Sequence, residues 1–216
     1  IINYIILSFL ILLAASCVDK EVNANTFFGG KIINPKTRFV ALYSNDKLID
    51  TLYLNNRNKF LGTYENLDEG LYYFQHGNEN QYVYLEPKDS LILRLNTWDF
   101  DESLVFVGKG AERNNILIDI FLETENERKL FYQLNKLAPL VYKNKIDSII
   151  NFKLGTYNEY KETHPKETAS YFKILKIALT HPIYSRVERY PINHVYTSRK
   201  ESFPETDSSF YAYRTD

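Results

Sequence analysis

Eight short, evenly spaced β-rich runs constrain the fold of this chain more than any other feature. The runs begin near residues 31, 38, 48, 59, 71, 81, 90 and 103, and consecutive starts lie 7 to 13 residues apart. Strands that follow one another at about 8–12 residues are typical of sandwiches and barrels. Eight such strands need two packed layers to bury their apolar faces, so we expect a β-sandwich over residues 27–109.

Turn sequences separate these runs, and one run alternates as a strand of an antiparallel sheet does. Asn45-Asp46 tolerates left-handed backbone geometry and favours a tight hairpin, and Pro87-Lys88-Asp89 suits a turn with proline at its second position. Leu91, Leu93 and Leu95 point to one face of their strand, and the residues between them point to the other. One buried face and one mostly wet face indicate an antiparallel β-sandwich.

After Gly108-Lys109-Gly110 the apolar spacing becomes helical. It continues to about residue 190, with a break at His164-Pro165 because the residue before proline avoids helical geometry. We expect a bundle of three or four amphipathic helices over residues 110–190, and from Tyr190-Pro191 an irregular segment over 191–216. The predicted fold class is therefore α+β. The helical positions are Ile116, Leu117, Ile120, Phe121, Leu130, Leu134, Leu137, Tyr142, Ile146, Ile150, Leu154, Tyr157, Phe172, Leu175, Leu179 and Ile183.

The first sixteen residues have the pattern of a secretion signal. Residues 5–15 are apolar apart from Ser8, which fits a signal-peptide core and is too short for a membrane span of roughly 20 residues. Small residues then precede Cys17, the only cysteine of the chain. We therefore expect residues 1–16 to be a lipoprotein signal peptide, Cys17 to carry a lipid, and residues 17–26 to form a tether. The alternative is an ordinary secretion signal followed by an incidental cysteine.

Charge and composition argue against several classes of function. With 26 Lys and Arg against 27 Asp and Glu, the chain lacks the cationic excess that nucleic acid binding requires. A single cysteine allows neither an internal disulfide nor a C-x-x-C pair. The histidines show no zinc-binding spacing, and no G-x-S-x-G nucleophile motif is present. We expect no catalytic, cofactor-binding or metal-binding residues in this chain. The histidines are His76, His164, His181 and His194.

Two segments carry residue types that occur at ligand sites. Residues 108–115 (GKGAERNN) join a strand to a helix, where free N–H groups can bind phosphate, but they lack the P-loop and dinucleotide-binding spacings. We expect a sharp strand-to-helix turn there. Asp99, Asp101 and Glu102 could offer oxygen ligands to Ca²⁺, but an EF-hand needs more of them, so we expect aspartates that cap their own turn. Most aromatic residues lie in β-rich runs, where packing accounts for them better than a glycan or peptide platform.

A series of short motifs runs in order along residues 17–214. In this order they resemble the N-terminal region, a domain of unknown function, of envelope lipoproteins from two-membrane bacteria whose C-terminal domain is a TlpA-like thioredoxin domain. That domain, with its C-x-x-C, would follow Asp216. The motifs are residues 28–35 (FGGKIINP), 46–52 (DKLIDTL), 69–72 (EGLY), 82–91 (YVYLEPKDSL), 100–104 (FDESL), 108–115 (GKGAERNN), 146–148 (IDS), 186–191 (RVERYP) and 211–214 (YAYR).

The resemblance implies a membrane-proximal module of a lipid-anchored thiol–disulfide oxidoreductase. Such a module is a spacer and interaction scaffold and is not itself catalytic. The implied location is the cell envelope, at the outer membrane with either face open, with the bilayer bound through Cys17 and with protein partners in the envelope. The alternative is a stand-alone surface lipoprotein whose β-sandwich binds a glycan or peptide. The sequence after Asp216 would separate the two.

Overall fold

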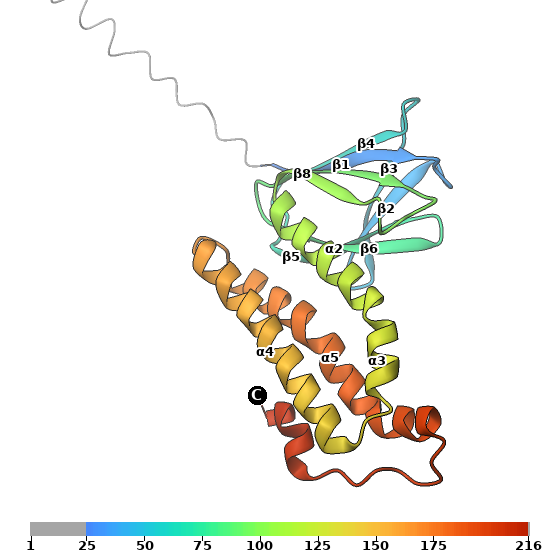
Figure 1. Cartoon of the computed structure of the whole chain (residues 1–216). Coiled ribbons are helices and arrows are strands. Elements are labelled where there is room, and N and C mark those ends of the chain that lie inside the picture. Colours follow the sequence, from blue (N-terminus) through green and yellow to red (C-terminus); the bar gives the residue numbers. More distant parts are fainter. Residues whose placement is uncertain (1–24, 216) are drawn as a thin grey trace, which may run out of the picture.

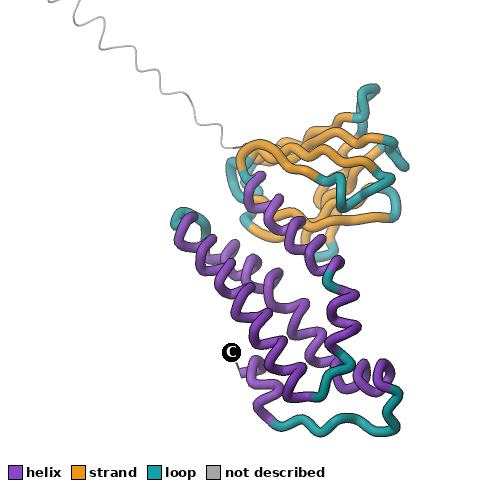
Figure 2. Tube along the Cα trace, viewed as in Figure 1, coloured by secondary structure: helices purple, strands orange, loops and turns teal. Residues whose placement is uncertain are grey.

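The computed structural model describes residues 25–215 and shows a mixed α+β fold (Figure 1). Strands make up one end of the molecule and helices the other (Figure 2). Cys17, the signal peptide and most of the tether lie outside the described residues, so lipidation of Cys17 stays a prediction. Among residues 25–215, none of the helices combines the length and the apolar character needed to cross a bilayer.

Eight strands form two four-stranded sheets, in the orders β4-β1-β7-β8 and β3-β2-β5-β6. Each strand begins within five residues of the start expected from the sequence. The strands are β1 (Thr26–Ile33), β2 (Phe39–Ser44), β3 (Lys47–Tyr53), β4 (Lys59–Tyr64), β5 (Gly70–His76), β6 (Glu79–Leu85), β7 (Ser90–Asn96) and β8 (Val105–Lys109).

One pairing differs from the antiparallel sheet expected from the sequence. β1 and β7 pair in parallel, from Phe27 opposite Ser90 to Ile33 opposite Asn96. The other five pairings between the described strands are antiparallel. Parallel neighbours need a long connection that returns the chain to the same end of the sheet, and the five strands between β1 and β7 provide it. Alternation within β7 does not depend on the direction of its neighbour, so the sequence could not reveal this pairing.

One cluster of buried apolar side chains draws its members from both sheets. Leu91, Leu93 and Leu95 are all buried in it, which confirms the predicted register of β7. Phe28 of β1 contacts Phe60 of the same sheet in edge-to-face geometry, with ring centres 5.7 Å apart. The other sheet contributes Val40, Leu42, Leu52, Tyr72, Phe74, Val83 and Leu85.

Replacing Leu93 with Ala should lower the free energy of unfolding by about 2–5 kcal/mol, because the side chain is almost fully buried and the truncation leaves a cavity. Chemical denaturation followed by circular dichroism measures the change. Ile92→Ala is a matched control, because that side chain points to the opposite face and is only partly buried. A smaller loss for Leu93→Ala than for Ile92→Ala would contradict the register.

The helical end is built from four α-helices and a terminal 3₁₀ element, and α4 and α5 run side by side in opposite directions (Figure 1). The chain reverses between them at residues 164–168, so the break predicted at His164-Pro165 is confirmed. α2 leads from the strands toward the other helices (Figure 2). The elements are α2 (Ala111–Asn126), α3 (Arg128–Leu134), α4 (Pro139–Thr163), α5 (Ala169–Ser198) and η1 (Ser208–Thr215).

The irregular segment begins later than the sequence indicated. α5 continues through Pro182 and Pro191 to Ser198, although a proline removes one helical hydrogen bond. Tertiary contacts hold this last part of the helix. The Tyr190 hydroxyl donates to the Leu137 carbonyl at 2.7 Å, and Nδ1 of buried His194 lies 2.9 Å from the Asn135 carbonyl oxygen. After Arg199, which has a φ of 53°, the chain leaves the helix.

The terminal element η1 is also ordered against the helices. Phe210 is buried against Tyr142 and Tyr190, with ring centres 6.0 and 5.3 Å away. Arg214 and Tyr213 both bind the carboxylate of Glu188 in α5. Residues 191–216 therefore contain the end of one helix and a second docked element, rather than the uniform irregular segment expected.

Candidate functional site

The glycine-rich segment singled out in the sequence forms the expected sharp turn between β8 and α2. Gly108 and Gly110 have φ values of 94° and 92°, a region that favours glycine. A Cβ on Gly108 would lie 2.0 Å from the Ser90 carbonyl oxygen, so a side chain has no room there. The strand ends at Lys109 and the helix begins at Ala111, which confirms the strand-to-helix turn.

Arg113, in the first turn of α2, is buried among three carboxylates. Its Nη2 lies 2.7 Å from Oδ2 of Asp89, a fully buried residue of the β6–β7 turn. Its Nη1 lies 3.2 Å from Oε2 of Glu86 and 3.1 Å from Oε2 of Glu167, which belongs to the α4–α5 connection. Burial alone would lower the pKa of Arg113, but the three carboxylates raise it. One cation therefore joins the strands, α2 and the α4–α5 hairpin.

The same cluster holds more negative than positive groups. Burial raises the pKa of Glu86, the charge of Arg113 lowers it, and repulsion from Asp89 raises it further, for a net increase. Oε1 of Glu86 and Oδ1 of Asp89 find no hydrogen-bond partner among residues 25–215. Removing Arg113 would leave these buried carboxylates without compensation.

Asn114 and Asn115 pair with the backbones of two different edge strands. The Asn114 amide accepts from Tyr84 N–H at 2.7 Å and donates to the Tyr84 carbonyl at 2.9 Å, on β6. The Asn115 amide accepts from Phe106 N–H at 2.9 Å and donates to the Phe106 carbonyl at 3.0 Å, on β8. Each Asn side chain thus makes the two hydrogen bonds that a peptide group of an adjacent strand would make to an edge strand. Because consecutive helical residues point about 100° apart, one helix reaches the edges of both sheets.

A hydroxyl network connects the strands to the start of α5. The hydroxyls of Tyr84 and Thr168 both donate to the carboxylate of Glu69, and these hydrogen bonds lower the pKa of Glu69. Thr168 caps α5 by accepting from Tyr171 N–H at 3.1 Å. The Tyr171 hydroxyl in turn donates to the Arg113 carbonyl at 3.1 Å.

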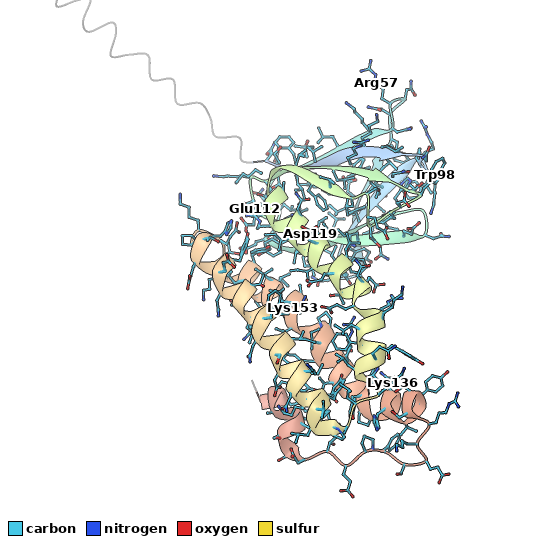
Figure 3. The ribbon with its side chains drawn as sticks, viewed as in Figure 1. Arg57, Trp98, Glu112, Asp119, Lys136 and Lys153 are labelled. Carbon is cyan, nitrogen blue, oxygen red and sulfur yellow. The ribbon has the colours of Figure 1, made fainter. Side chains whose placement is uncertain are left out.

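A second buried cation, Lys153 of α4, joins the helices to one another (Figure 3). Its Nζ lies 2.5 Å from Oε2 of Glu123 and 3.4 Å from Oε1 of Glu127. Glu127 also pairs with Arg186 of α5 at 2.8 Å, and the Arg186 guanidinium lies 3.9 Å from the ring centre of Phe131. Glu123 therefore connects α2 to α4, and Glu127, which lies between α2 and α3, connects α4 to α5.

The histidines lie apart from one another and have different surroundings. Nε2 of fully buried His76 accepts from Lys36 N–H at 2.9 Å, while Nδ1 lies 2.9 Å from the Phe39 carbonyl oxygen, a pattern that indicates the neutral ring with its proton on Nδ1. His164 instead pairs with Glu112 at 2.9 Å. His181 and His194 lie on α5. In the part of the chain that the structure describes, no group of three or more potential metal ligands gathers.

The acidic loop after β7 is held by the apolar core. Phe100 is buried, and the Asp99 carbonyl accepts from Ser103 N–H at 2.9 Å. The Asp101 carboxylate accepts from the Gln81 amide of β6 at 2.9 Å, rather than capping its own turn as expected. Trp98 is exposed at the strand end of the molecule (Figure 3). The loop is therefore tied to β6 by a side-chain contact that its own sequence does not indicate.

Comparison of the chain with known protein families, curated proteins and solved structures finds no match. Arg113, Asn114 and Asn115 direct their polar groups to other parts of the protein, which gives residues 113–115 a structural role at the junction of strands and helices. Sequence reasoning recognised the turn but missed this role. The available signal was the polar run of residues 112–115, which directly precedes the apolar run of residues 116–118 in the same helix.

Replacing Arg113 with Ala should lower the free energy of unfolding by about 3–5 kcal/mol, because it leaves buried carboxylates unpaired. Arg128→Ala is the matched control. Arg128 pairs with Glu125 at the surface, where such a pair contributes about 1 kcal/mol or less. Urea denaturation compares the two variants, and equal losses would contradict the junction role of Arg113.

His76 and His164 should influence stability in opposite directions as the pH falls. Burial lowers the pKa of His76, so the unfolded chain takes up the proton first, and the stabilisation by His76 is lost as the pH falls below about 6.5. Partial burial would lower the pKa of His164, but hydrogen bonds to Glu112 and Tyr160 raise it, so this stabilisation is lost as the pH rises above about 6.5.

Urea denaturation from about pH 8 to about pH 5.5 tests both signs. The stability difference between wild type and His76→Gln should shrink as the pH is lowered. The difference between wild type and His164→Gln should grow over the same range. If both stability differences changed in the same direction as the pH falls, the environment described for one of the two histidines would be wrong.

Proposed function

We propose that residues 17–216 form the membrane-proximal N-terminal module of a lipid-anchored thiol–disulfide oxidoreductase of a two-membrane bacterial envelope. The module is a spacer and interaction scaffold for a thioredoxin-like domain that follows it. The ordered motifs of residues 17–214 support the family, and Cys17 after an apolar core supports the anchor. No catalytic step is assigned to this chain.

The observation that carries the spacer role is the junction at Arg113, Asn114 and Asn115. Because these side chains fix α2 to both sheets and to the α4–α5 connection, the strand end and the helical end are held together by specific contacts. The chain enters the described structure at the strand end, and η1 lies at the helical end (Figure 1). A domain that follows η1 would be held away from the anchor and kept at high local concentration near the membrane.

The proposed module consists of an N-terminal β-sandwich followed by a helical bundle. Two four-stranded sheets that share one apolar cluster support an N-terminal β-sandwich. The pairing of Glu127 with both Lys153 and Arg186 supports a helical bundle after it. The β1–β7 pair makes such a sandwich mixed rather than purely antiparallel.

One observation favours a second candidate function, a surface lipoprotein that binds a glycan or peptide. Tyr43, Tyr73 and Tyr82 lie opposite one another on three adjacent strands. The Tyr43 and Tyr73 rings stack with their centres 4.8 Å apart, and Tyr82, which is exposed, meets Tyr73 edge-on at 6.0 Å. Such a row offers both apolar ring surface and hydroxyl groups. A gene that ends near Asp216 would favour this candidate.

The complete gene product should reduce insulin in the presence of dithiothreitol, whereas residues 1–216 alone should not. The reason is that disulfide exchange needs an accessible thiolate and a resolving cysteine, and this chain has one cysteine. Cys17→Ala in the complete product should retain the reductase activity but move the protein from the detergent phase to the aqueous phase.

Three outcomes would contradict parts of the proposal. Insulin reduction by residues 1–216 alone would show a catalytic group in this chain. A complete gene product without C-x-x-C would remove the oxidoreductase. Equal partitioning of wild type and Cys17→Ala would remove the lipid anchor.

A further inference from the structure

The outer face of sheet β4-β1-β7-β8 carries a row of three cations. Lys59 of β4 lies opposite Lys31 of β1, and Lys31 lies opposite Arg94 of β7. All three side chains are exposed, and none forms an ion pair with a carboxylate among residues 25–215. Like charges directly opposite one another in a sheet destabilise it. The stability of the sheet therefore does not account for this row of cations, which indicates a role in binding.

The neighbouring row on the same face is apolar. Gly29 lies between Leu61 of β4 and Ile92 of β7, and Ile92 lies opposite Val107 of β8. Leu61 and Val107 are more than half exposed. The two rows are two residues apart along the strands, which corresponds to roughly 7 Å. Apolar and cationic side chains therefore lie next to each other in two parallel bands.

The side chains of both rows line one groove with a volume of about 1190 Å³. Gly29 leaves the middle of the apolar row without a side chain, and a Cβ there would lie 2.7 Å from the Phe60 carbonyl oxygen and 2.8 Å from Cδ1 of Leu61. The lining includes Lys31, Lys59 and Arg94 but no Asp or Glu. In a chain with net charge −1, this groove is a local concentration of positive charge on an apolar floor.

The chemistry of the groove selects among possible occupants. The four paired strands use their backbone groups within the sheet, so the face offers few hydrogen bonds to a peptide backbone. The amide groups of a peptide on the apolar row would lose their hydrogen bonds to water without gaining new hydrogen bonds to the protein. An alkyl chain has no polar groups, so its binding carries no such cost. The apolar row crosses four strands and spans roughly 14 Å, and the cation row spans roughly 10 Å.

We infer that this groove binds an anionic lipid. Its negatively charged head lies on Lys31, Lys59 and Arg94, and its alkyl chain lies along Leu61, Ile92 and Val107. The inference goes beyond the module role and depends on neither the Cys17 anchor nor a following thioredoxin domain. It gives the strand end of the protein a ligand of its own.

Dodecyl phosphate below its critical micelle concentration is the probe, measured by isothermal titration calorimetry. All arms use the full chain with Cys17→Ala, so that no attached acyl chain competes. Dodecyl phosphate should bind saturably at one site, and inorganic phosphate and uncharged dodecyl maltoside should each bind at least about tenfold more weakly, because each supplies only half of the contacts. This comparison separates an amphiphile site from a simple anion site or a simple apolar site.

Charge reversal at the cation row tests the assigned residues. Lys31→Glu and Arg94→Glu should each weaken dodecyl phosphate binding by about tenfold or more, since each removes a charge-assisted contact and adds repulsion. Lys47→Glu is the matched control, an exposed strand lysine of the other sheet, and should leave the affinity unchanged. Unchanged thermal unfolding would show that the variants keep their fold.

The inference is overturned if dodecyl maltoside or inorganic phosphate binds as tightly as dodecyl phosphate. It is equally overturned if the folded Arg94→Glu variant binds dodecyl phosphate normally. An acidic peptide that binds this face more tightly than dodecyl phosphate, and loses binding in the same variants, would assign the groove to a peptide instead.

Discussion

The buried charge of Arg113 is the interaction on which the rest of the structure depends. A guanidinium taken out of water is stable only when carboxylates surround it, and here they come from the β6–β7 turn and from the α4–α5 connection. Both regions must therefore be in place before Arg113 can be buried. The neighbouring Asn114 and Asn115 extend the same requirement to β6 and β8, because their amides complete the hydrogen bonds of those edge strands.

The helical end continues this pattern of polar contacts that each join several elements. Glu127 is shared between Lys153 and Arg186, and Glu69 receives hydroxyls from Tyr84 and Thr168. Burying polar groups of this kind costs desolvation energy, which offsets part of the stability that their pairing adds. The Glu69 contacts lie where strands and helices meet, and the Glu127 contacts lie where helices meet one another.

Much of the fold could be predicted because it depends on local patterns. The strand positions follow from turn residues and alternation, and Leu91, Leu93 and Leu95 lie in the core as their alternation indicated. The break at His164-Pro165 follows from proline sterics. The irregular segment predicted from Pro191 was wrong in its first part, because buried Tyr190 and His194 hold the helix through contacts to residues 135–137 that no local pattern encodes. The role of residues 113–115 was missed for the same reason.

The sequence by itself determined the order and kind of the elements, since periodicity and turn chemistry act between residues only a few positions apart. The tertiary structure alone decided that β1 lies beside β7 in parallel, that one helix closes the edges of two sheets, and that three cations form a row. Lys31, Lys59 and Arg94 are 28 and 35 residues apart in the chain, and only the register of β4, β1 and β7 brings them together. Pairing between distant strands depends on the whole core, so no window of sequence contains it.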